Sequence, residues 1–458
     1  MDAIAAISTG NQIAAIGVLR LSGDGAFAIA DGVFVPADGR PLSAHPRRTM
    51  VYGALKNREG ETIDQALAVT FAAGHSYTGE DSVEFHCHGS PVVLAEGLGA
   101  LFAAGARQAL GGEFTKRAFL SGNMDLTQAE AVIDLIEAET PQAARNAVEQ
   151  LGGALRRQID EVYDGLLEIT SRFYAVVDYP DEDIEDLQRP ELESALRAAE
   201  HTLSSLLATA RRGQILKNGV PTAIIGRPNA GKSSLLNALV GYDRAIVTDV
   251  PGTTRDTVEE KVLCGGVLLR LIDTAGLRET GDAVERLGVE RTRAALASAE
   301  LVLLVIDGSQ ALTDEDREAL RIVREAHKPC IVVFSKADLG IAQPHQVLEG
   351  DGGRMISAVH VSSVTGEGIT VLEDTVAAVY PAGGGAMGSI LTNPRQTEAV
   401  ERALTAVRGA REALTGGMTP DAVLTDAEAA LGALGELSGR TAREDMVERI
   451  FSRFCVGK

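Results

Sequence analysis

The chain has 458 residues, a formal net charge of -21 and a hydrophobic fraction of 45%. This length allows about two or three domains, each with a core of its own. The acidity argues against a protein that holds nucleic acid mainly through its own phosphate contacts, because such proteins need clustered Lys and Arg. Any RNA partner is therefore expected to bind weakly, or to be held mostly by another protein.

The sequence carries no signal for a membrane or for secretion. Its longest apolar run, Leu301 to Ile306, is far too short to span a bilayer. The N-terminal residues lack the basic and apolar regions of a signal peptide. The four cysteines are widely scattered, which favours a reducing compartment without disulfides. We therefore expect a cytoplasmic protein that has no membrane segment.

The first half of the chain contains two different sequence patterns. Residues 1–122 mix short apolar runs with Gly and Pro, which favours strands with a few helices and predicts an α+β N-terminal domain. Residues 123–217 have apolar residues at helical spacing, which predicts the first half of an all-α helical domain. Thr127 and Glu130 have the spacing of a capping box, so we expect Thr127 to be an N-cap residue. The acidic stretch 178–186 is more simply a solvated loop than a metal site.

The second half begins with a different pattern. Residues 218–379 alternate apolar strands with helices, which predicts buried parallel strands and an α/β P-loop domain with a Ras-like sheet. A Gly-rich stretch with the composition of a flexible linker follows. Residues 380–458 then return to helical spacing. The α/β domain is therefore predicted to be inserted into a helical domain whose two halves flank it.

The strongest functional signal is GRPNAGKSS, from Gly226 to Ser234. It matches G-x-x-x-x-G-K-[ST] between an expected strand and an expected helix, which is the context that this phosphate-binding motif requires. Backbone N–H groups of such a loop surround phosphates, and the helix N-terminus adds a positive dipole end. Lys232 is expected to reach the β- and γ-phosphates, and Ser233 to ligate Mg²⁺. The alternative, a Gly-rich turn without a ligand, does not explain why strand, loop and helix are in register.

Two later segments have the spacing of nucleotide-sensing switches. Asp273, after the next apolar strand, is expected to hold the Mg²⁺ shell, and the Gly276 N–H to sense the γ-phosphate. Thr254, in the intervening loop, is expected to offer its hydroxyl to Mg²⁺. Leu277 stands where a Ras-like GTPase carries the Gln that orients the attacking water. Water positioning must therefore come from elsewhere.

The base is expected to be guanine. The segment SKAD, which ends at Asp338, resembles the N-K-x-D motif of GTPases, whose Asp pairs with the N1–H and exocyclic amine of guanine. Ser335 stands where Asn is usual, which puts the tether between this loop and the base in doubt. Ser362 and Ser363 fit the weaker last guanine motif. Asp338 also argues against an ATP-dependent enzyme.

Longer segments carry a family resemblance. SYTGEDSVEFHCHGS, GEFTKRAFLSGNMDLTQAEAVIDLIEAET, DTAGLRETGDAVERLGVER and the terminal FCVGK follow one another in the order of the bacterial and organellar tRNA modification GTPases called MnmE or TrmE. The chain resembles that family over essentially its whole length, with a G domain of the TrmE-Era-Septin type. The resemblance implies a homodimer that joins a FAD-containing partner, MnmG, as a heterotetramer. Together they would build a carboxymethylaminomethyl or aminomethyl group on C5 of the wobble uridine of tRNA, which the partner would mainly hold.

The resemblance also implies how GTP is hydrolysed. GTP hydrolysis would be driven by dimerisation of the G domains, and K⁺ would replace an arginine finger, with Asn229, Thr248, Val250 and Thr253 as its ligands. Glu285 would orient the water, with Lys232 and Asn229 as further catalytic groups; from the residues alone, Glu285 is simply a solvated helix residue. The full set expected to bind GTP is Asn229, Ala230, Gly231, Lys232, Ser233, Ser234, Thr248, Thr253, Thr254, Asp273, Gly276, Lys336, Asp338, Ser362 and Ser363.

A second cofactor site follows from the same resemblance. A tetrahydrofolate derivative, in its 5-formyl or methylene form, would supply the one-carbon unit and bind Arg20, Glu84, Asn123 and Lys458. Arginine suits the folate carboxylates or a polarised carbonyl, and a Glu suits two hydrogen bonds to the pterin edge. Asn123 stands where the family often has Lys, so one positive charge is missing.

Two groups of cysteine and histidine residues could have a chemical role. His86, Cys87 and His88 are too few for a zinc site and are better explained as strand-end residues near the folate pocket. Cys455 is either a nucleophile that adds to the uracil ring, which needs a lowered thiol pKa, or a small packed side chain.

One other functional class is compatible with the G domain. A GTP-dependent binding switch in ribosome or RNA assembly would keep the nucleotide motifs without base chemistry. Such a switch would carry a basic RNA-binding appendage, which the acidity and the FCVGK tail argue against.

Overall fold

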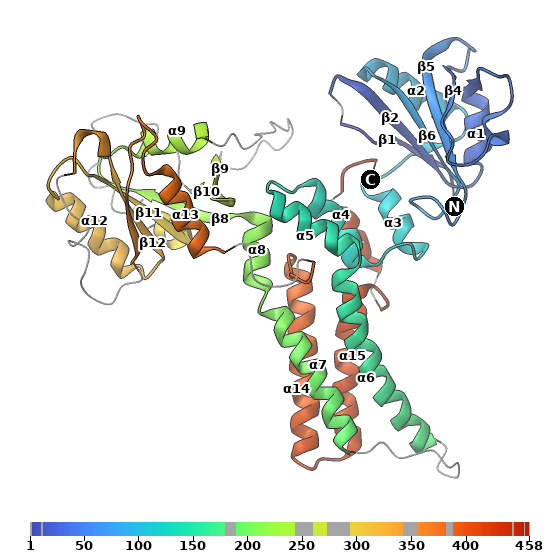
Figure 1. The fold of residues 1–458 in the computed structure, drawn as a ribbon. Coiled ribbons are helices and arrows are strands. Elements are labelled where there is room, and N and C mark those ends of the chain that lie inside the picture. Colours follow the sequence, from blue (N-terminus) through green and yellow to red (C-terminus); the bar gives the residue numbers. More distant parts are fainter. Residues whose placement is uncertain are drawn as a thin grey trace. The chain divides into compact units, whose positions relative to one another are not determined.

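The computed structural model describes residues 2–10, 12–178, 189–242, 260–272, 294–341, 355–381, 388–441, 444–452 and 454–457. The predicted fold class is confirmed, since the chain has an α+β N-terminal domain, helical segments and an inserted α/β P-loop domain (Figure 1). Within the described residues, no helix is both long enough and apolar enough to cross a bilayer. The boundaries predicted at residues 122, 217 and 379 stay predictions. The two compact units of the chain are Met1–Ile133 with Val148–Ser205 and Glu398–Lys458, and Asp134–Ala147 with Leu206–Thr397.

The N-terminal domain is a seven-stranded sheet in the order β3-β4-β5-β6-β2-β1-β7, with α1 and α2 packed on one face (Figure 1). Side chains alternate along the strands, so Leu19 of β2 and Phe85 of β6 point into the core under α1 and α2. Arg20 and Glu84 face each other across the same two strands on the opposite face. The strands are β1 (Ile4–Ile7), β2 (Ala14–Ser22), β3 (Phe34–Pro36), β4 (Val51–Lys56), β5 (Thr62–Phe71), β6 (Ser82–Gly89) and β7 (Arg107–Gln108). The helices are α1 (Ala26–Val33), η1 (Leu42–Ala44), α2 (Pro91–Ala103) and α3 (Glu113–Leu120).

The G domain is a six-stranded sheet in the order β13-β12-β11-β8-β10-β9. The edge strand β9 is antiparallel to β10, and the other neighbours pair in parallel, as the sequence predicts. All seven residues of β11 are buried, because helices cover both faces. The strands are β8 (Val220–Ile225), β9 (Glu260–Cys264), β10 (Val267–Ile272), β11 (Leu301–Asp307), β12 (Cys330–Ser335) and β13 (Met355–His360). The helices are α9 (Lys232–Tyr242), α12 (Asp314–Glu325), η2 (Ala337–Leu339) and α13 (Ile369–Val379).

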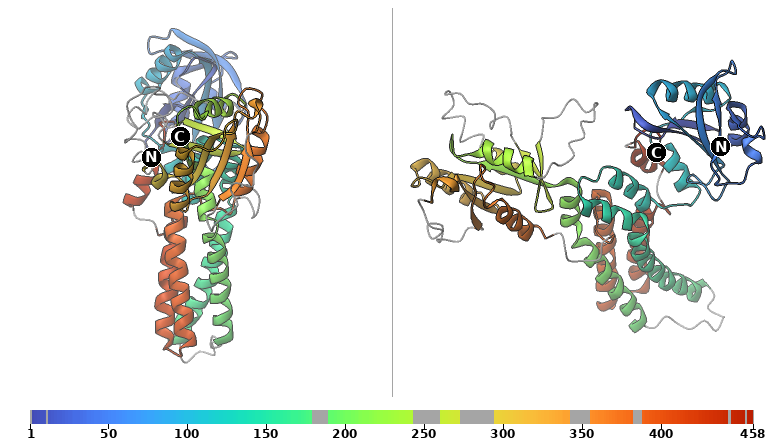
Figure 2. Two further views of the ribbon diagram at one scale, coloured as in Figure 1. Left: turned by 90° about the vertical axis from the view of Figure 1, so that its left-hand side faces the viewer. Right: turned by 45° about the horizontal axis from the view of Figure 1, so that its top comes forward.

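The helical segments come from both sides of the inserted domain. Four long helices, α6, α7, α14 and α15, run side by side (Figures 1 and 2). Ion pairs cross between them, such as Arg408 Nε to Glu200 Oε1 at 3.0 Å between α14 and α7. The helices are α4 (Leu126–Ile136), α5 (Pro141–Leu151), α6 (Ala154–Asp178), α7 (Arg189–Leu207), α8 (Ala210–Asn218), α14 (Pro394–Thr415), α15 (Pro420–Ser438) and α16 (Glu444–Phe451).

The predicted capping box is wrong by two residues. Helix α4 begins at Leu126, so Thr127 lies inside its first turn. Asp125 caps the helix instead, because its carboxylate accepts a hydrogen bond from the Gln128 N–H at 2.8 Å. The Gln128 side chain accepts one in return from the Asp125 N–H at 3.1 Å, which completes the box. The Thr127 hydroxyl also donates to Asp125, which explains why a residue of capping type stands there.

Candidate functional site

The phosphate loop has the backbone conformation that its glycines and its Asn permit. It runs from Gly226 at the end of β8 to Gly231 before α9. The φ angles are 156° at Gly226, 60° at Asn229 and 96° at Gly231, and Asn is among the non-glycine residues that tolerate a left-handed φ. A Cβ at Gly226 would lie 2.2 Å from the Val305 carbonyl oxygen. Only glycine therefore allows the loop to lie this close to β11.

Lys232 spans the phosphate loop. Its Nζ donates to the carbonyl oxygens of Gly226 at 2.7 Å and Arg227 at 2.8 Å. Burial lowers the pKa of this ammonium group, because the charged form loses hydration. An incoming phosphate would restore the favourable environment for the charge. Ser233 and Ser234 follow on the exposed first turn of α9, where a hydroxyl oxygen suits Mg²⁺.

The guanine loop is held by two side-chain contacts. The Ser362 hydroxyl donates to Asp338 Oδ1 at 2.6 Å, which fixes the carboxylate expected to read the base. Backbone N–H groups of Val364 and Thr365 donate in turn to the Ser362 oxygen at 3.3 and 3.2 Å. Lys336 has a left-handed φ of 58°, and its Nζ lies 2.7 Å from Asp307 Oδ2. Ser363 is half-buried beside Ser362.

Ser335 contacts the phosphate loop, and the weakened tether to the base that its substitution for Asn predicts stays a prediction. The Ser335 hydroxyl donates to the Ala230 carbonyl oxygen in the phosphate loop at 2.5 Å. The phosphate and guanine loops, far apart in sequence, are therefore joined directly beneath the place where both would meet a nucleotide. The structure brings together Asn229, Ala230, Gly231, Lys232, Ser233, Ser234, Lys336, Asp338, Ser362 and Ser363 at the carboxyl ends of β8, β12 and β13.

Several predicted site residues lie outside the described residues, and so does most of the acidic stretch 178–186. The site residues are Thr248, Val250, Thr253, Thr254, Asp273, Gly276, Glu285 and Lys458.

A second polar site lies on the open face of the N-terminal sheet. The Arg20 guanidinium reaches Glu84 Oε1 through Nε at 3.0 Å and Nη2 at 2.9 Å. It also stacks between two aromatic rings, with centroid distances of 5.3 Å to Tyr77 and 5.6 Å to Phe114. Burial raises the pKa of Tyr77, whose hydroxyl lies 2.9 Å from that of Thr115. The Arg20 guanidinium is thus held by one carboxylate and two aromatic rings.

His86 is the next residue on the same face of β6. Its Nε2 lies 3.6 Å from Glu84 Oε2, is buried and has no hydrogen-bond partner among the described residues. Buried polar atoms normally have a partner, so this nitrogen and the neighbouring carboxylate oxygen are suited to a ligand that offers hydrogen bonds. The pterin edge of a folate has such groups, and the residues present therefore fit a tetrahydrofolate derivative.

Asn123 takes part in this site as a structural residue. Its amide Nδ2 donates to the carbonyl oxygens of Ser76 at 3.1 Å and Tyr77 at 3.3 Å. The side chain therefore pins the loop that carries Tyr77 toward Arg20. A lysine at this position would offer a charge in place of these two hydrogen bonds.

The loop 76–80 is anchored from below by buried polar groups. The hydroxyls of Ser22, Thr78 and Ser82 form a chain with distances of 2.7 and 2.9 Å from Ser22. Arg117, which is 4% exposed, contacts Glu80 Oε2 at 3.0 Å. These contacts give Tyr77 a fixed position, which a site assembled from a loop needs.

The described part of the C-terminal tail lies at the start of the N-terminal sheet. Val456 forms a β-bridge with Gly111, and the Ser8 hydroxyl donates to the Gly457 carbonyl oxygen at 3.2 Å. A Cβ at Gly457 would lie 2.3 Å from the Ile7 carbonyl oxygen. Cys455 precedes Val456. Its side chain is exposed, and its carbonyl oxygen accepts a hydrogen bond from the Gly112 N–H.

The three residues from His86 to His88 do not converge. Cys87 points into the core, where burial raises the pKa of its thiol to about 12. His88 is exposed on the strand and pairs with Asp64 at 2.7 Å. Among the described residues, no group of His, Cys, Asp and Glu is placed to hold a metal ion.

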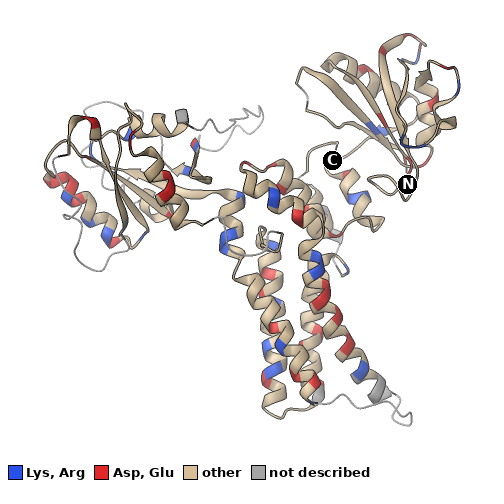
Figure 3. Ribbon diagram, viewed as in Figure 1, with Lys and Arg blue, Asp and Glu red and all other residues tan. Residues whose placement is uncertain are grey.

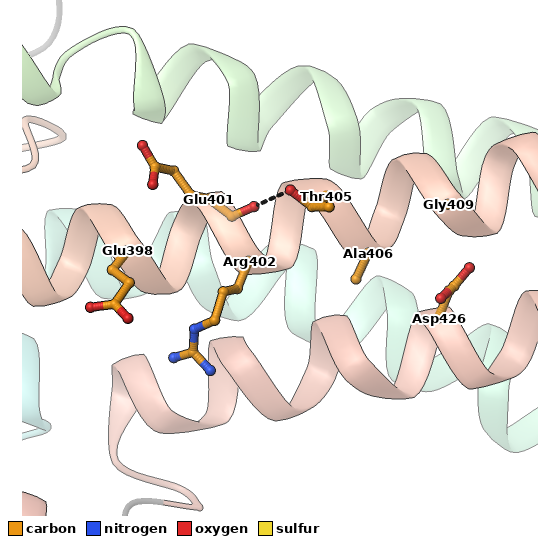
Figure 4. A pocket seen from close by; sticks show the side chains of 7 residues that line it. All are labelled: Glu398, Glu401, Arg402, Thr405, Ala406, Gly409 and Asp426. Atoms are coloured by element: carbon orange, nitrogen blue, oxygen red, sulfur yellow. Dashed lines mark hydrogen bonds between the residues drawn. The ribbon is translucent and has the colours of Figure 1, made fainter.

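One surface hollow lies between two of the long helices. It is an open groove of about 630 Å³ along α14 and the facing turn of α15 (Figure 4). Glu398, Glu401 and Asp426 line it, and Arg402 is already paired with Glu436 at 2.6 Å. None of its lining residues belongs to either predicted site, and we assign it no function.

Sequence reasoning missed the aromatic flanks of Arg20 and the contacts beneath the loops. Tyr77 and Phe114 each lie in short motifs without a periodic signal, and only the fold brings them to Arg20. Asp307 gives a weak signal, as a charged residue that ends an apolar strand. Nothing in the sequence shows that it meets Lys336.

Comparison with known proteins gives a consistent result. A model described as "MnmE helical domain" matches residues 126–455, and one described as "GTP-binding protein TrmE N-terminus" matches residues 3–123. A tRNA modification GTPase MnmE of Symbiobacterium thermophilum is 45% identical over all of this chain and 99% of its own. The protein of the same name from Chloroflexus aurantiacus is 44% identical over the full length of both chains. Among solved structures, Era in complex with MgGDPNP and nucleotides of 16S ribosomal RNA is 26% identical over 40% of this chain and 65% of its own, with a TM-score of 0.27.

Proposed function

The chain belongs to the MnmE family of tRNA modification GTPases, and on that premise we propose that it is a K⁺-activated GTPase acting on the wobble uridine of tRNA. The family establishes the coarser activity, which is GTP hydrolysis in the service of tRNA modification. The finer proposal is that the chain, with a FAD-containing MnmG-like partner, installs a carboxymethylaminomethyl or aminomethyl group on C5 of that uridine.

One observation carries the nucleotide part of the proposal. Asp338 is fixed by Ser362 in a loop that a buried hydrogen bond joins to the phosphate loop. Asp338 would accept hydrogen bonds from the N1–H and exocyclic amine of guanine. Lys232 would move from the loop carbonyls to the β- and γ-phosphates. Mg²⁺, held through Ser233 and Thr254, would neutralise phosphate charge.

The hydrolysis step needs a positive charge and a positioned water molecule. K⁺ would supply the charge near the transferred phosphate, held by Asn229, Thr248, Val250 and Thr253. Asn229 fits this role, because it is exposed at the turn of the phosphate loop and carries a neutral side-chain oxygen. Glu285 would orient the water.

Comparison of two salts tests this step. We expect GTP hydrolysis to be at least roughly tenfold faster in KCl than in NaCl at equal ionic strength, because Na⁺ is too small for a site lined by carbonyl oxygens. A Rb⁺ sample, with an ion close to K⁺ in size, is the matched control and should restore most of the rate. Equal rates in K⁺ and Na⁺ would contradict the proposed activation.

The open face of the N-terminal sheet supports the folate and dimer parts of the proposal. Arg20 and Glu84 lie on it, and the neighbouring His86 Nε2 makes no hydrogen bond to any described residue. Ile16, Val35, Tyr52 and Leu67 are 60%, 45%, 56% and 39% exposed, and the strand register places them on this same face. Exposed apolar residues over one sheet face are typical of a protein interface. We propose that a second copy covers them.

The charge distribution supports a tRNA held mainly by the partner. Lys and Arg are interspersed with Asp and Glu along most of the described helices, and α8, with Arg211, Arg212 and Lys217, is a short basic exception (Figure 3). A surface of this kind releases few counterions on contact with RNA, so its own affinity for tRNA should be low. The four free cysteines support our placement of the protein in the cytoplasm.

Cys455 has the exposure that a nucleophile needs, and we keep covalent addition to the uracil ring as its proposed role. Cys455→Ser should abolish modification while GTP hydrolysis continues at the wild-type rate. Normal modification by that variant would leave Cys455 as a packing residue of the tail.

A further inference from the structure

The turn between β9 and β10 lies against two helices of different segments. Gly265 and Gly266 form it with φ angles of 58° and 77°, the left-handed values of a two-residue type I′ turn. A Cβ at Gly265 would lie 2.2 Å from the Glu373 carbonyl oxygen of α13, and one at Gly266 would lie 3.3 Å from Gln142 Nε2 of α5. Glycines at both positions therefore allow the hairpin to contact α13 and α5 together.

An ion pair joins the same hairpin to the start of α5. Lys261 Nζ of β9 lies 2.5 Å from Glu139 Oε1. Thr140 follows Glu139 and caps α5, since its hydroxyl oxygen accepts a hydrogen bond from the Ala143 N–H at 3.1 Å. The paired side chains are 43% and 41% exposed, and an exposed ion pair contributes little to overall stability. Its effect is therefore local, because it ties β9 to the beginning of α5.

The far part of α5 and the end of α4 are bound to the segments that enter and follow the G domain. Asn146, which is 1% exposed, accepts a hydrogen bond from the Gly388 N–H at 2.9 Å. Asp134 of α4 accepts one from the Thr392 hydroxyl at 2.7 Å and lies 2.6 Å from Nζ of Lys217 in α8, the helix that leads into β8. Buried polar contacts of this kind hold a single arrangement. Most of α5 therefore belongs to the compact unit that contains the G domain.

The hairpin is flanked in sequence by the two segments expected to sense the nucleotide. Thr254 precedes β9 and Asp273 directly follows β10, and both are expected near the Mg²⁺ of a bound nucleotide. Segments with this role change conformation when the γ-phosphate is lost. Among the described strands, β9 is an edge strand that pairs with β10 alone, so fewer hydrogen bonds restrain it than an inner strand. A change in either segment can thus displace the hairpin.

We propose that α5 carries the state of the nucleotide to the helical domain, with the Lys261–Glu139 ion pair and the turn at Gly266 as the coupling contacts. The boundary between the two compact units runs within α4 and α5 themselves, after Ile133 and after Ala147. A helix is a rigid element, so a shift at the start of α5 reaches its end. The inference concerns GTP binding and does not depend on K⁺, folate or the partner.

Hydrogen exchange of the full-length protein, measured by mass spectrometry, tests this coupling. The protein is saturated with Mg²⁺ and either GDP or GppNHp, a GTP analogue that is not hydrolysed. We expect the amides of α5 to exchange at rates that differ by about threefold or more between the two nucleotides. Lys261→Glu places two like charges together and should reduce this difference by more than half, with unchanged affinity for both nucleotides. Lys261→Glu combined with Glu139→Lys exchanges the charges and should restore the difference.

Two further variants separate the ion pair from general effects of charge. Arg321→Glu reverses one member of another exposed ion pair of the G domain, with Glu318 on α12 at 2.6 Å, and should leave exchange at α5 unchanged. Lys261→Gln removes the charge without adding repulsion, so it should also reduce the difference, and it serves if Lys261→Glu does not fold.

Three results would overturn the proposal. They are equal exchange of α5 with GDP and GppNHp in the wild type, a full difference in both Lys261 variants, and a charge-exchanged double variant that does not restore the difference. Because the measurement reports on α5 and not on tRNA, its failure would leave the proposed function untouched.

Discussion

The nucleotide site and the candidate folate pocket are built in opposite ways. The nucleotide site consists of short consecutive segments at the ends of parallel strands, and its loops are joined by a hydrogen bond between Ser335 and Ala230. The folate pocket consists of single residues from distant parts of the chain, brought together by the register of β2 and β6.

The two sites also differ in how their charges are satisfied before a ligand arrives. Lys232 donates hydrogen bonds to backbone carbonyl oxygens. A phosphate can replace these acceptors without leaving another charged group unpaired. Arg20 is bound to Glu84, so a folate in the proposed pocket would have to share or break an ion pair. We therefore expect a substitution in the nucleotide site to change nucleotide affinity strongly and without effects elsewhere. A substitution of Arg20 or Glu84 should also disturb its ion-pair partner.

The largest effect should come from the base-reading carboxylate. Asp338→Asn exchanges an acceptor for a donor, so it should lower GTP affinity by about a hundredfold or more and improve binding of xanthosine triphosphate. Competition binding with both nucleotides measures the exchange. Asp314→Asn, at the exposed start of α12, is the control and should not alter selectivity. Unchanged preference for GTP would remove the assignment of SKAD as the guanine loop.

Next in size should be the loss of the folate-pocket carboxylate. Glu84→Gln removes the charge that holds Arg20 and the acceptors proposed for the pterin edge, so affinity for 5-formyltetrahydrofolate should fall by roughly ten- to a hundredfold. Direct titration with this folate measures the loss, with GTP hydrolysis expected to persist. Asp64→Asn removes another carboxylate of the same sheet, paired with His88 away from the pocket, and should not change folate binding. Wild-type affinity in Glu84→Gln would place the folate elsewhere.

A smaller effect, of opposite sign, should follow from restoring the family's lysine. Asn123→Lys adds a positive charge near the pocket and should raise folate affinity several-fold at low salt, with the gain shrinking at high salt. Asn123→Ala separates charge from loop support, because it removes only the hydrogen bonds to Ser76 and Tyr77. If both variants bind folate more weakly, then Asn123 acts through the loop alone and the charge argument fails.

The smallest effect concerns the network beneath the pocket. Burial alone would raise the pKa of Glu113, but hydrogen bonds from Arg107, the Leu110 N–H and Arg117 lower it to about 2, from 4.5. Its ionised form therefore adds stability that is present above pH 4.5 and is lost as the pH falls toward 2. Glu113→Gln should lower the Tm by a few degrees at pH 7, and by progressively less as the pH approaches 3. A Tm difference that does not depend on pH would show that Glu113 contributes through packing.

The two sites were predictable from the sequence to different degrees. The order of strands in the G domain and the phosphate loop follow from local patterns, because each motif holds its own strand, turn and helix. The N-cap of α4 could not be read in the same way, since Thr127 and Asp125 are both capping residues and only the hydrogen bond to Gln128 decides between them.

The candidate folate pocket shows why the other contacts could not be predicted from the sequence. Arg20 and Glu84 were named from a family resemblance, and their pairing depends on a strand register that no local pattern fixes. Tyr77 reaches Arg20 only because Asn123 and the buried hydroxyls hold its loop. Ser335 was predicted to weaken the contact between the guanine loop and the base, which stays a prediction, and its hydrogen bond to Ala230 could not be read from the sequence. Such contacts depend on tertiary structure and have no sequence period.

Analysis of tRNA nucleosides tests the proposed function most directly. Total tRNA is taken from cells that lack this protein and from the same cells supplied with the wild-type chain or with Asp338→Asn. We predict that the carboxymethylaminomethyl or aminomethyl group on wobble uridine C5 is lost without the protein, returns with the wild type, and does not return with the variant that cannot select GTP. Normal wobble-uridine modification in cells without the protein would contradict the proposed chemistry and leave a GTPase with another task in tRNA modification.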